Sequence, residues 1–135
     1  YVNLTAPSST FSNNTIENIR DLGILAEGSN AAFTNNTVNG ITAGSGINIT
    51  SSNTTVSENR FLNIQAGTGI IVNGADNLIA NNFVEADGVG IAKGISLQAN
   101  GSGSKVVFNS INITGTDVAN GVGLEVVCGS NYRVK

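Results

Sequence analysis

Few titratable residues in this 135-residue chain stand where they could do chemistry together. It has nine acidic and six basic residues and no histidine, so the commonest acid–base side chain is absent. Glu85 and Asp87 form a close acidic pair, Lys93 follows in the same stretch, and Asp117 comes about one repeat later. Acid–base catalysis needs at least two positioned titratable groups. These four residues are the candidates for a catalytic site, and the alternative role for them is loop solubility with local hydrogen bonding.

The sequence predicts neither a metal nor a cofactor. It contains no Cys/His cluster and no calcium-loop pattern, and its Gly-rich pieces GSGI and GSGSK lack the spacing of a phosphate loop. The net charge of −3 and the lack of a basic stripe argue against nucleic acid. No apolar run approaches the ~18 residues of a membrane span.

The elements that must position these residues form a repeat. Five asparagines recur at spacings of 22, 23, 23 and 27 residues, each with an apolar residue three before it and two after it: Asn14, Asn36, Asn59, Asn82 and Asn109. A Gly–Ile or Gly–Leu pair recurs in step with them. Self-similarity at a period of roughly 20 to 50 residues is typical of a solenoid.

Each repeat contains three short extended segments between Gly, Asn and Ser turns. Alternation such as Ile47-Asn48-Ile49 indicates strands with one face inward and one outward. We therefore predict one all-β domain over residues 1–135, with five to six coils of about 23 residues. The repeated asparagines would form an internal ladder, because an amide both donates and accepts hydrogen bonds.

Three stretches carry a resemblance that covers nearly the whole chain: GINITSSNTTVSENRFLNI, GIIVNGADNLIANNFV and GLEVVCGSNYRV. They resemble the right-handed, single-stranded parallel β-helix superfamily, which includes pectate lyases, alginate epimerases, NosD-like nitrous-oxide accessory proteins and phage tailspikes. The resemblance implies the fold. In the superfamily's lyases and hydrolases, carboxylates, an Arg or Lys base and sometimes calcium lie on an outer sheet. The superfamily shares coils rather than chemistry, so no single activity follows.

One coil carries apolar residues at positions that alternation sends outward. These are Ile71, Leu78 and Phe83, and the matching positions of other coils are mostly polar. We predict a lateral interface with another chain. Alternatively, Phe83 with Arg60 and Glu85 forms a platform for a sugar. A register slip of one residue would reverse both assignments.

The ends of the chain read as strands without an amphipathic capping helix. Such ends expose apolar core and unpaired strand edges, which favours stacking. The chain is then either a segment of a longer solenoid or is covered by partner chains. The end residues expected at such an interface are Tyr1, Val2, Leu4, Leu124, Val126 and Val134.

Two coils are longer than the others, with extra residues near 87–93, 100–104 and 116–120. Insertions in a solenoid form loops, often on the binding face. Among the Asn-x-Ser/Thr sequons, Asn48 and Asn53 are the expected glycosylation sites if the host glycosylates the protein.

These features together favour an extracellular, non-catalytic module similar to a phage tailspike segment. It would work as a trimer of identical chains on a virion or cell surface and bind surface polysaccharide. The first alternative is a structural or adhesive filament that stacks head to tail. The second is a secreted polysaccharide lyase, hydrolase or epimerase.

Overall fold

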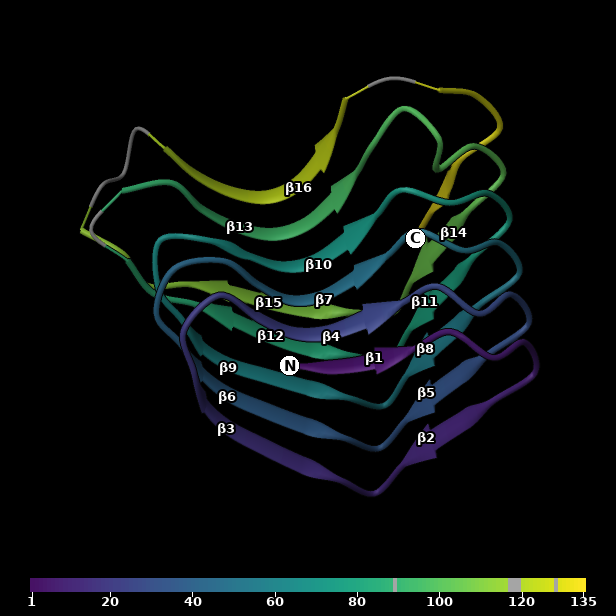
Figure 1. The fold of residues 1–135 in the computed structure, drawn as a ribbon. Helices are drawn as coiled ribbons and strands as arrows, with labels where there is room; N and C mark the ends of the chain where they lie inside the picture. Colours follow the sequence, from purple (N-terminus) through teal and green to yellow (C-terminus); the bar gives the residue numbers. More distant parts are fainter. Residues whose placement is uncertain (89, 117–119, 128) are drawn as a thin grey trace.

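A computed structural model describes residues 1–88, 90–116, 120–127 and 129–135. Figure 1 shows stacked coils in which strands from successive coils lie side by side in three sheets. The strand pairs of the described residues are parallel, and each full coil adds one strand to each sheet in turn. The described residues form five full coils and two strands of a sixth, which confirms the predicted all-β solenoid.

The sheets are named A, B and C in the order in which each coil visits them. Sheet A contains β1 (Val2–Leu4), β4 (Leu22–Ala26), β7 (Ser45–Ile49), β10 (Thr68–Val72), β13 (Ala92–Leu97) and β16 (Gly121–Val126). Sheet B contains β2 (Thr10–Ser12), β5 (Ala32–Thr34), β8 (Thr55–Ser57), β11 (Leu78–Ala80), β14 (Lys105–Val107) and β17 (Arg133–Val134). Sheet C contains β3 (Thr15–Ile19), β6 (Thr37–Ile41), β9 (Arg60–Ile64), β12 (Phe83–Ala86) and β15 (Ser110–Ile113).

The core consists of inward residues that repeat from coil to coil. In sheet A, Ile47, Ile70 and Ile95 lie in register and are fully buried. Phe33 and Phe61 fill the same interior from sheets B and C. Burying one such side chain contributes about 1.5–3 kcal/mol relative to leaving it exposed. Because every coil repeats these positions, the core is continuous along the axis.

The repeated glycine before each isoleucine is required by close packing. A Cβ on Gly46 would lie 2.5 Å from Cδ1 of Phe61 and 2.6 Å from the carbonyl oxygen of Gly69. Neither the aromatic ring nor the next coil's backbone can yield without disturbing the core. Glycine here lets sheet A approach the side chains of sheet C.

The five repeated asparagines form a ladder of hydrogen bonds inside the turn between sheets B and C. Oδ1 of Asn59 accepts from the backbone N–H of Asn36 at 2.9 Å and from its side-chain Nδ2 at 3.0 Å. Asn59 in turn donates to Oδ1 of Asn82, which repeats the pattern. The three middle members are buried, so this ladder satisfies polar groups that would otherwise be costly.

A second buried polar row lies in the turn between sheets A and B. The backbone N–H of Thr54 donates to Oδ1 of Asn77 at 2.6 Å, and the N–H of Asn77 donates to Oγ of Ser104 at 3.1 Å. All three side chains are fully buried. The sequence did not predict this row, because its members differ in type from coil to coil.

The first and last coils show the apolar exposure expected of them. Tyr1 is 71% exposed, Val126 48% and Val134 50%, whereas Val2, Leu4 and Leu124 are half-buried. Strands β1 and β16 are the two edges of sheet A. Among the described residues, each of these two strands pairs with a neighbour on one side only.

Candidate functional site

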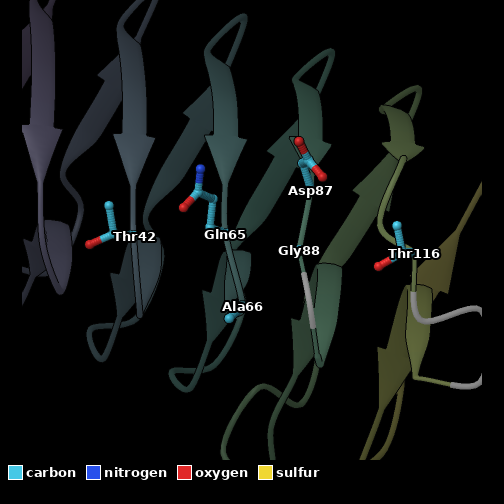
Figure 2. A pocket seen from close by; sticks show the side chains of 6 residues that line it. All are labelled: Thr42, Gln65, Ala66, Asp87, Gly88 and Thr116. Carbon is cyan, nitrogen blue, oxygen red and sulfur yellow. The ribbon is translucent and has the colours of Figure 1, made fainter.

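A polar groove lies where the strands of sheet C end and the chain turns toward sheet A. Its volume is about 390 Å³, and its lining residues are Thr42, Gln65, Ala66, Asp87, Gly88 and Thr116. Thr42, Gln65 and Asp87 directly follow β6, β9 and β12, and Thr116 comes shortly after β15. Figure 2 shows these side chains on neighbouring coils, one after another along the axis.

Stacking of the backbone positions the groove residues. The N–H of Gln65 donates to the carbonyl of Ile41 at 2.7 Å, and the N–H of Asp87 donates to that of Ile64 at 2.9 Å. Successive coils are therefore about 4.8 Å apart here, the spacing of paired strands. Thr42, Gln65 and Asp87 are exposed to a ligand that lies along the axis. The Thr42 hydroxyl donates to the carbonyl oxygen of Arg20 at 3.3 Å and can still accept a hydrogen bond.

The groove offers hydrogen bonding rather than concentrated charge. Two hydroxyls, one amide and one carboxylate line it, and each can accept a hydrogen bond. Ala66 and Gly88 keep its floor low, since a Cβ on Gly88 would come within 2.6 Å of the backbone nitrogen of Ala66. Such a surface suits a ligand with many hydroxyl groups.

The structure splits the candidate catalytic group. Asp87 lines the groove, while Glu85 lies half-buried on β12 beside Asn112 of β15. Lys93 does not complete the group, because it lies in β13 of sheet A and its ammonium is 2.6 Å from Oε1 of Glu125. Asp117 lies outside the described residues.

Lys93 instead belongs to a polar network on the outer face of sheet A. Oε2 of Glu125 accepts from the hydroxyl of Ser96 at 2.6 Å, and Nε2 of Gln98 donates to that hydroxyl at 2.5 Å. The hydrogen bond from Lys93, followed by that from Ser96, lowers the pKa of Glu125, and burial opposes the shift weakly. The carboxylate therefore stays ionised and is a poor general acid.

Comparison with known families settles the type of coil. A family described as the right handed beta helix region matches residues 2–135. The chain belongs to this family. No curated protein and no solved structure gives a significant match. Membership establishes the right-handed β-helix and does not by itself define a ligand or an activity.

On sheet C of this β-helix, Arg60 and Phe83 come together as a pair. They are register partners on β9 and β12, and Cζ of Arg60 lies 5.9 Å from the centroid of the Phe83 ring. That separation is typical of a cation–π contact. Glu85 follows on the same outer face. The three residues of the sugar-platform hypothesis are thus neighbours, although binding itself stays a prediction.

The three apolar residues assigned to a lateral interface do not share one face. Ile71 lies in β10 of sheet A, Leu78 in β11 of sheet B and Phe83 in β12 of sheet C. Ile71 and Leu78 are half-buried, and Phe83 is 37% exposed. All three alternate with fully buried residues, as expected, but one flat partner surface could not cover them together.

The two sequons differ in accessibility. Asn53 is exposed in a turn with φ of 56°, whereas Asn48 is half-buried on β7. Oδ1 of Asn48 is buried and has no hydrogen-bond partner among the described residues. Asn53 is thus the better presented of the two acceptors.

A second hollow of the β-helix was not predicted from the sequence. It has a volume of about 240 Å³ and is lined by Lys105, Val107, Phe108, Arg133 and Lys135. One signal was visible beforehand: Phe108 precedes the ladder residue Asn109 at a position where other coils have Asn or Glu.

Among the described residues, no three or more Cys, Asp or Glu side chains are placed together to hold a metal ion. In the same residues, no helix has the length and apolar character needed to cross a membrane.

Proposed function

We propose that this β-helix is a non-catalytic module that binds surface polysaccharide outside the cell, in the groove of Figure 2. The observation that carries the proposal is the row of polar side chains that four successive coils present to one hollow. A polysaccharide repeats its hydroxyl groups along its length. A row of donors and acceptors that repeats at about 4.8 Å can engage several sugar units at once.

Binding without turnover is favoured by the groove's acid–base content. Asp87 is the single titratable side chain among the six lining residues. Glycoside hydrolysis typically uses a pair of carboxyl groups on either side of the scissile bond. The other carboxylate of the acidic pair, Glu85, is half-buried beside Asn112 and is not among the residues that line the groove.

A second candidate function, polysaccharide hydrolysis, has one observation in its favour. Glu85 and Asp87 alternate with the buried Ala86, so both face outward at a spacing of about 7 Å along the chain. Carboxyl groups roughly 5–9 Å apart are the pattern of glycosidases. The double variant Glu85→Gln/Asp87→Asn separates the functions: loss of reducing-end release from a polysaccharide would establish hydrolysis.

We also propose that identical chains associate end to end or as a trimer. Exposed apolar residues at the two ends of the described solenoid support end contact, chiefly Val126 and Val134 at one end and Tyr1 at the other. Light-scattering mass with negative-stain microscopy tests this directly. A trimer or regular fibres support association, and a monomer at high concentration contradicts it.

The groove proposal is tested by calorimetric titration of the protein with a panel of neutral bacterial polysaccharides. Gln65→Ala and Thr42→Val should each weaken binding about fivefold or more, since each removes a hydrogen bond worth roughly 1 kcal/mol. Thr10→Val on sheet B is the matched control, because it removes an exposed threonine hydroxyl far from the lining residues. If the groove variants bind every ligand as tightly as the control does, the groove is not the site.

A further inference from the structure

Half of the protein's cations gather in one place. Of six Lys and Arg residues, Lys105, Arg133 and Lys135 line the hollow at the end of sheet B. Lys105 and Arg133 are register partners on β14 and β17, which sets their side chains next to each other on the outer face. All three are exposed. In a chain of net charge −3, this clustering is a local feature and not a consequence of composition.

Phe108 adds an aromatic ring to the cluster at a conformational cost. Its φ is 57°, in the left-handed region, which a bulky side chain disfavours. The equivalent residues of the other coils have similar φ values, and three of the four are asparagines, which tolerate this region better: Asn13, Asn35, Glu58 and Asn81. Phe108 is also 68% exposed, so burial offers little compensation. Backbone strain retained at an exposed aromatic residue is typical of a functional position.

The backbone fixes the ring beside the charges. The N–H of Phe108 donates to the carbonyl oxygen of Lys135 at 3.0 Å, and the N–H of Lys135 donates to the carbonyl of Val106 at 3.0 Å. Val107 supplies an apolar surface between them. The result is a shallow hollow that combines positive charge, an aromatic ring and an apolar floor.

We propose that this hollow, named the basic site, binds an acidic saccharide: a sugar that carries a carboxylate or a sulfate. Arg133 and the two lysines would donate charge-assisted hydrogen bonds to the anionic group. The ring of Phe108 would pack against the apolar face of the sugar ring. The site is distinct from the groove of Figure 2, which draws on sheet C turns, and it does not depend on that groove's function.

The surface next to the basic site favours a polymer over a small ion. Along the outer face of sheet B, Leu78 and Ala80 follow, and then Thr55 and Ser57. The hydroxyl groups of Thr55 and Ser57, two coils from β14, can hydrogen-bond further sugar units. A duplex nucleic acid is disfavoured, because the chain has a net charge of −3 and the three cations of the site can neutralise only a few phosphates.

The test measures binding of the whole chain to heparin, polygalacturonate, neutral dextran and a duplex DNA at low and moderate salt. The basic site should bind heparin or polygalacturonate and not dextran, and its affinity should fall as salt rises. Lys105→Gln/Arg133→Gln should weaken binding at least about tenfold. Phe108→Asn should also weaken it, while leaving the charge intact.

Arg20→Gln is the charge control for the single variant Arg133→Gln, because each removes one cation. Arg20 is exposed in the turn between sheets C and A, far in the chain from the basic site. Equal losses in Arg20→Gln and Arg133→Gln would reduce the effect to net charge and overturn the site. Equal binding of dextran, tighter binding of DNA than of either acidic polymer, or no binding at low salt would overturn it too. The groove variant Gln65→Ala should bind the acidic polymers normally, so failure of one proposal leaves the other intact.

Discussion

The outer face of sheet B presents two unlike surfaces on one repeated backbone. The first three coils carry small hydroxyl residues there, which we name the hydroxyl half: Thr10, Ser12, Thr34, Thr55 and Ser57. The last two carry the basic site, the basic half of the face. The inward residues that alternate with these outward positions are apolar in both halves, for example Phe33 and Val106. The difference teaches that packing of the core constrains the inward positions and leaves the outward positions free to diverge.

The largest expected effect tests the division between inward and outward positions, and it uses β11, the strand between the two halves. Ile79 points inward and is fully buried, while its neighbour Leu78 points outward and is half-buried. Ile79→Ala should lower the free energy of unfolding by about 2–5 kcal/mol, because it leaves a cavity in a packed core. Leu78→Ala should cost under about 1 kcal/mol. Urea unfolding of both variants measures the contrast, and similar losses would mean that the inward and outward assignments are wrong.

The next largest effect is the loss of stability when one ladder asparagine is replaced, and it should be equal in the two halves. Oδ1 of Asn59, in the hydroxyl half, accepts two hydrogen bonds from the buried Asn36, and Oδ1 of Asn109, in the basic half, accepts two from the buried Asn82. Replacing either asparagine by alanine leaves buried donors unpaired, at a cost of about 1–3 kcal/mol. Denaturant unfolding should give the same loss for both variants within about 0.5 kcal/mol.

Asn112→Ala is the control for the ladder variants, because Asn112 is an exposed asparagine outside the ladder. It should change the free energy of unfolding by under about 0.5 kcal/mol. A ladder effect confined to one half would show that the repeat is not energetically uniform, and the comparison of the halves would then lose its common background.

The sequence predicted what repeats and missed what does not. The ladder and the core were visible because Asn59 or Ile70 has an equivalent in most coils at a nearly constant spacing. The row of Thr54, Asn77 and Ser104 was not, because one buried hydrogen-bonding position is filled by three residue types. Alternation identifies the outward residues of each strand, and only the stacking of coils shows which of them become neighbours.

The missed sites have the same physical origin. The groove joins single residues from four coils, and the pair of Lys93 with Glu125 joins residues 32 apart in the chain. No repeated pattern marks either. Phe108 is the partial exception, since its break with Asn13, Asn35 and Asn81 could be read before the fold was known.

Exchanging Phe and Asn at the residue before the ladder asparagine, where the backbone is left-handed, should sharpen the comparison between coils. Phe108→Asn should raise the free energy of unfolding by about 1 kcal/mol, because asparagine tolerates φ near 57° better than phenylalanine. Asn81→Phe, at φ of 56°, should lower it by a similar amount. Thermal unfolding of both variants measures the two changes. A stability gain together with lost acidic-saccharide binding in Phe108→Asn marks strain kept for function; a stability loss would show that the ring supports the fold.

The smallest expected effect concerns an ion pair on sheet A. The late coils pair Lys93 with Glu125, whereas an early coil has Ser45 and Asn48 at the matching positions. The pKa of Glu125 is lowered in the folded state from its ordinary value of 4.5, chiefly by the hydrogen bond from Lys93. The unfolded chain therefore takes up the proton first as pH falls, and the stabilisation is lost between pH 4.5 and the lower folded-state pKa. Glu125→Gln should thus cost most near neutral pH and progressively less in acid, as measured by urea unfolding across that range. In a Lys93→Gln background the same substitution should show a weaker pH dependence, because the main cause of the shift is gone. If the cost of Glu125→Gln does not change with pH, the carboxylate contributes through packing alone, and the charged pair does not distinguish the late coils energetically.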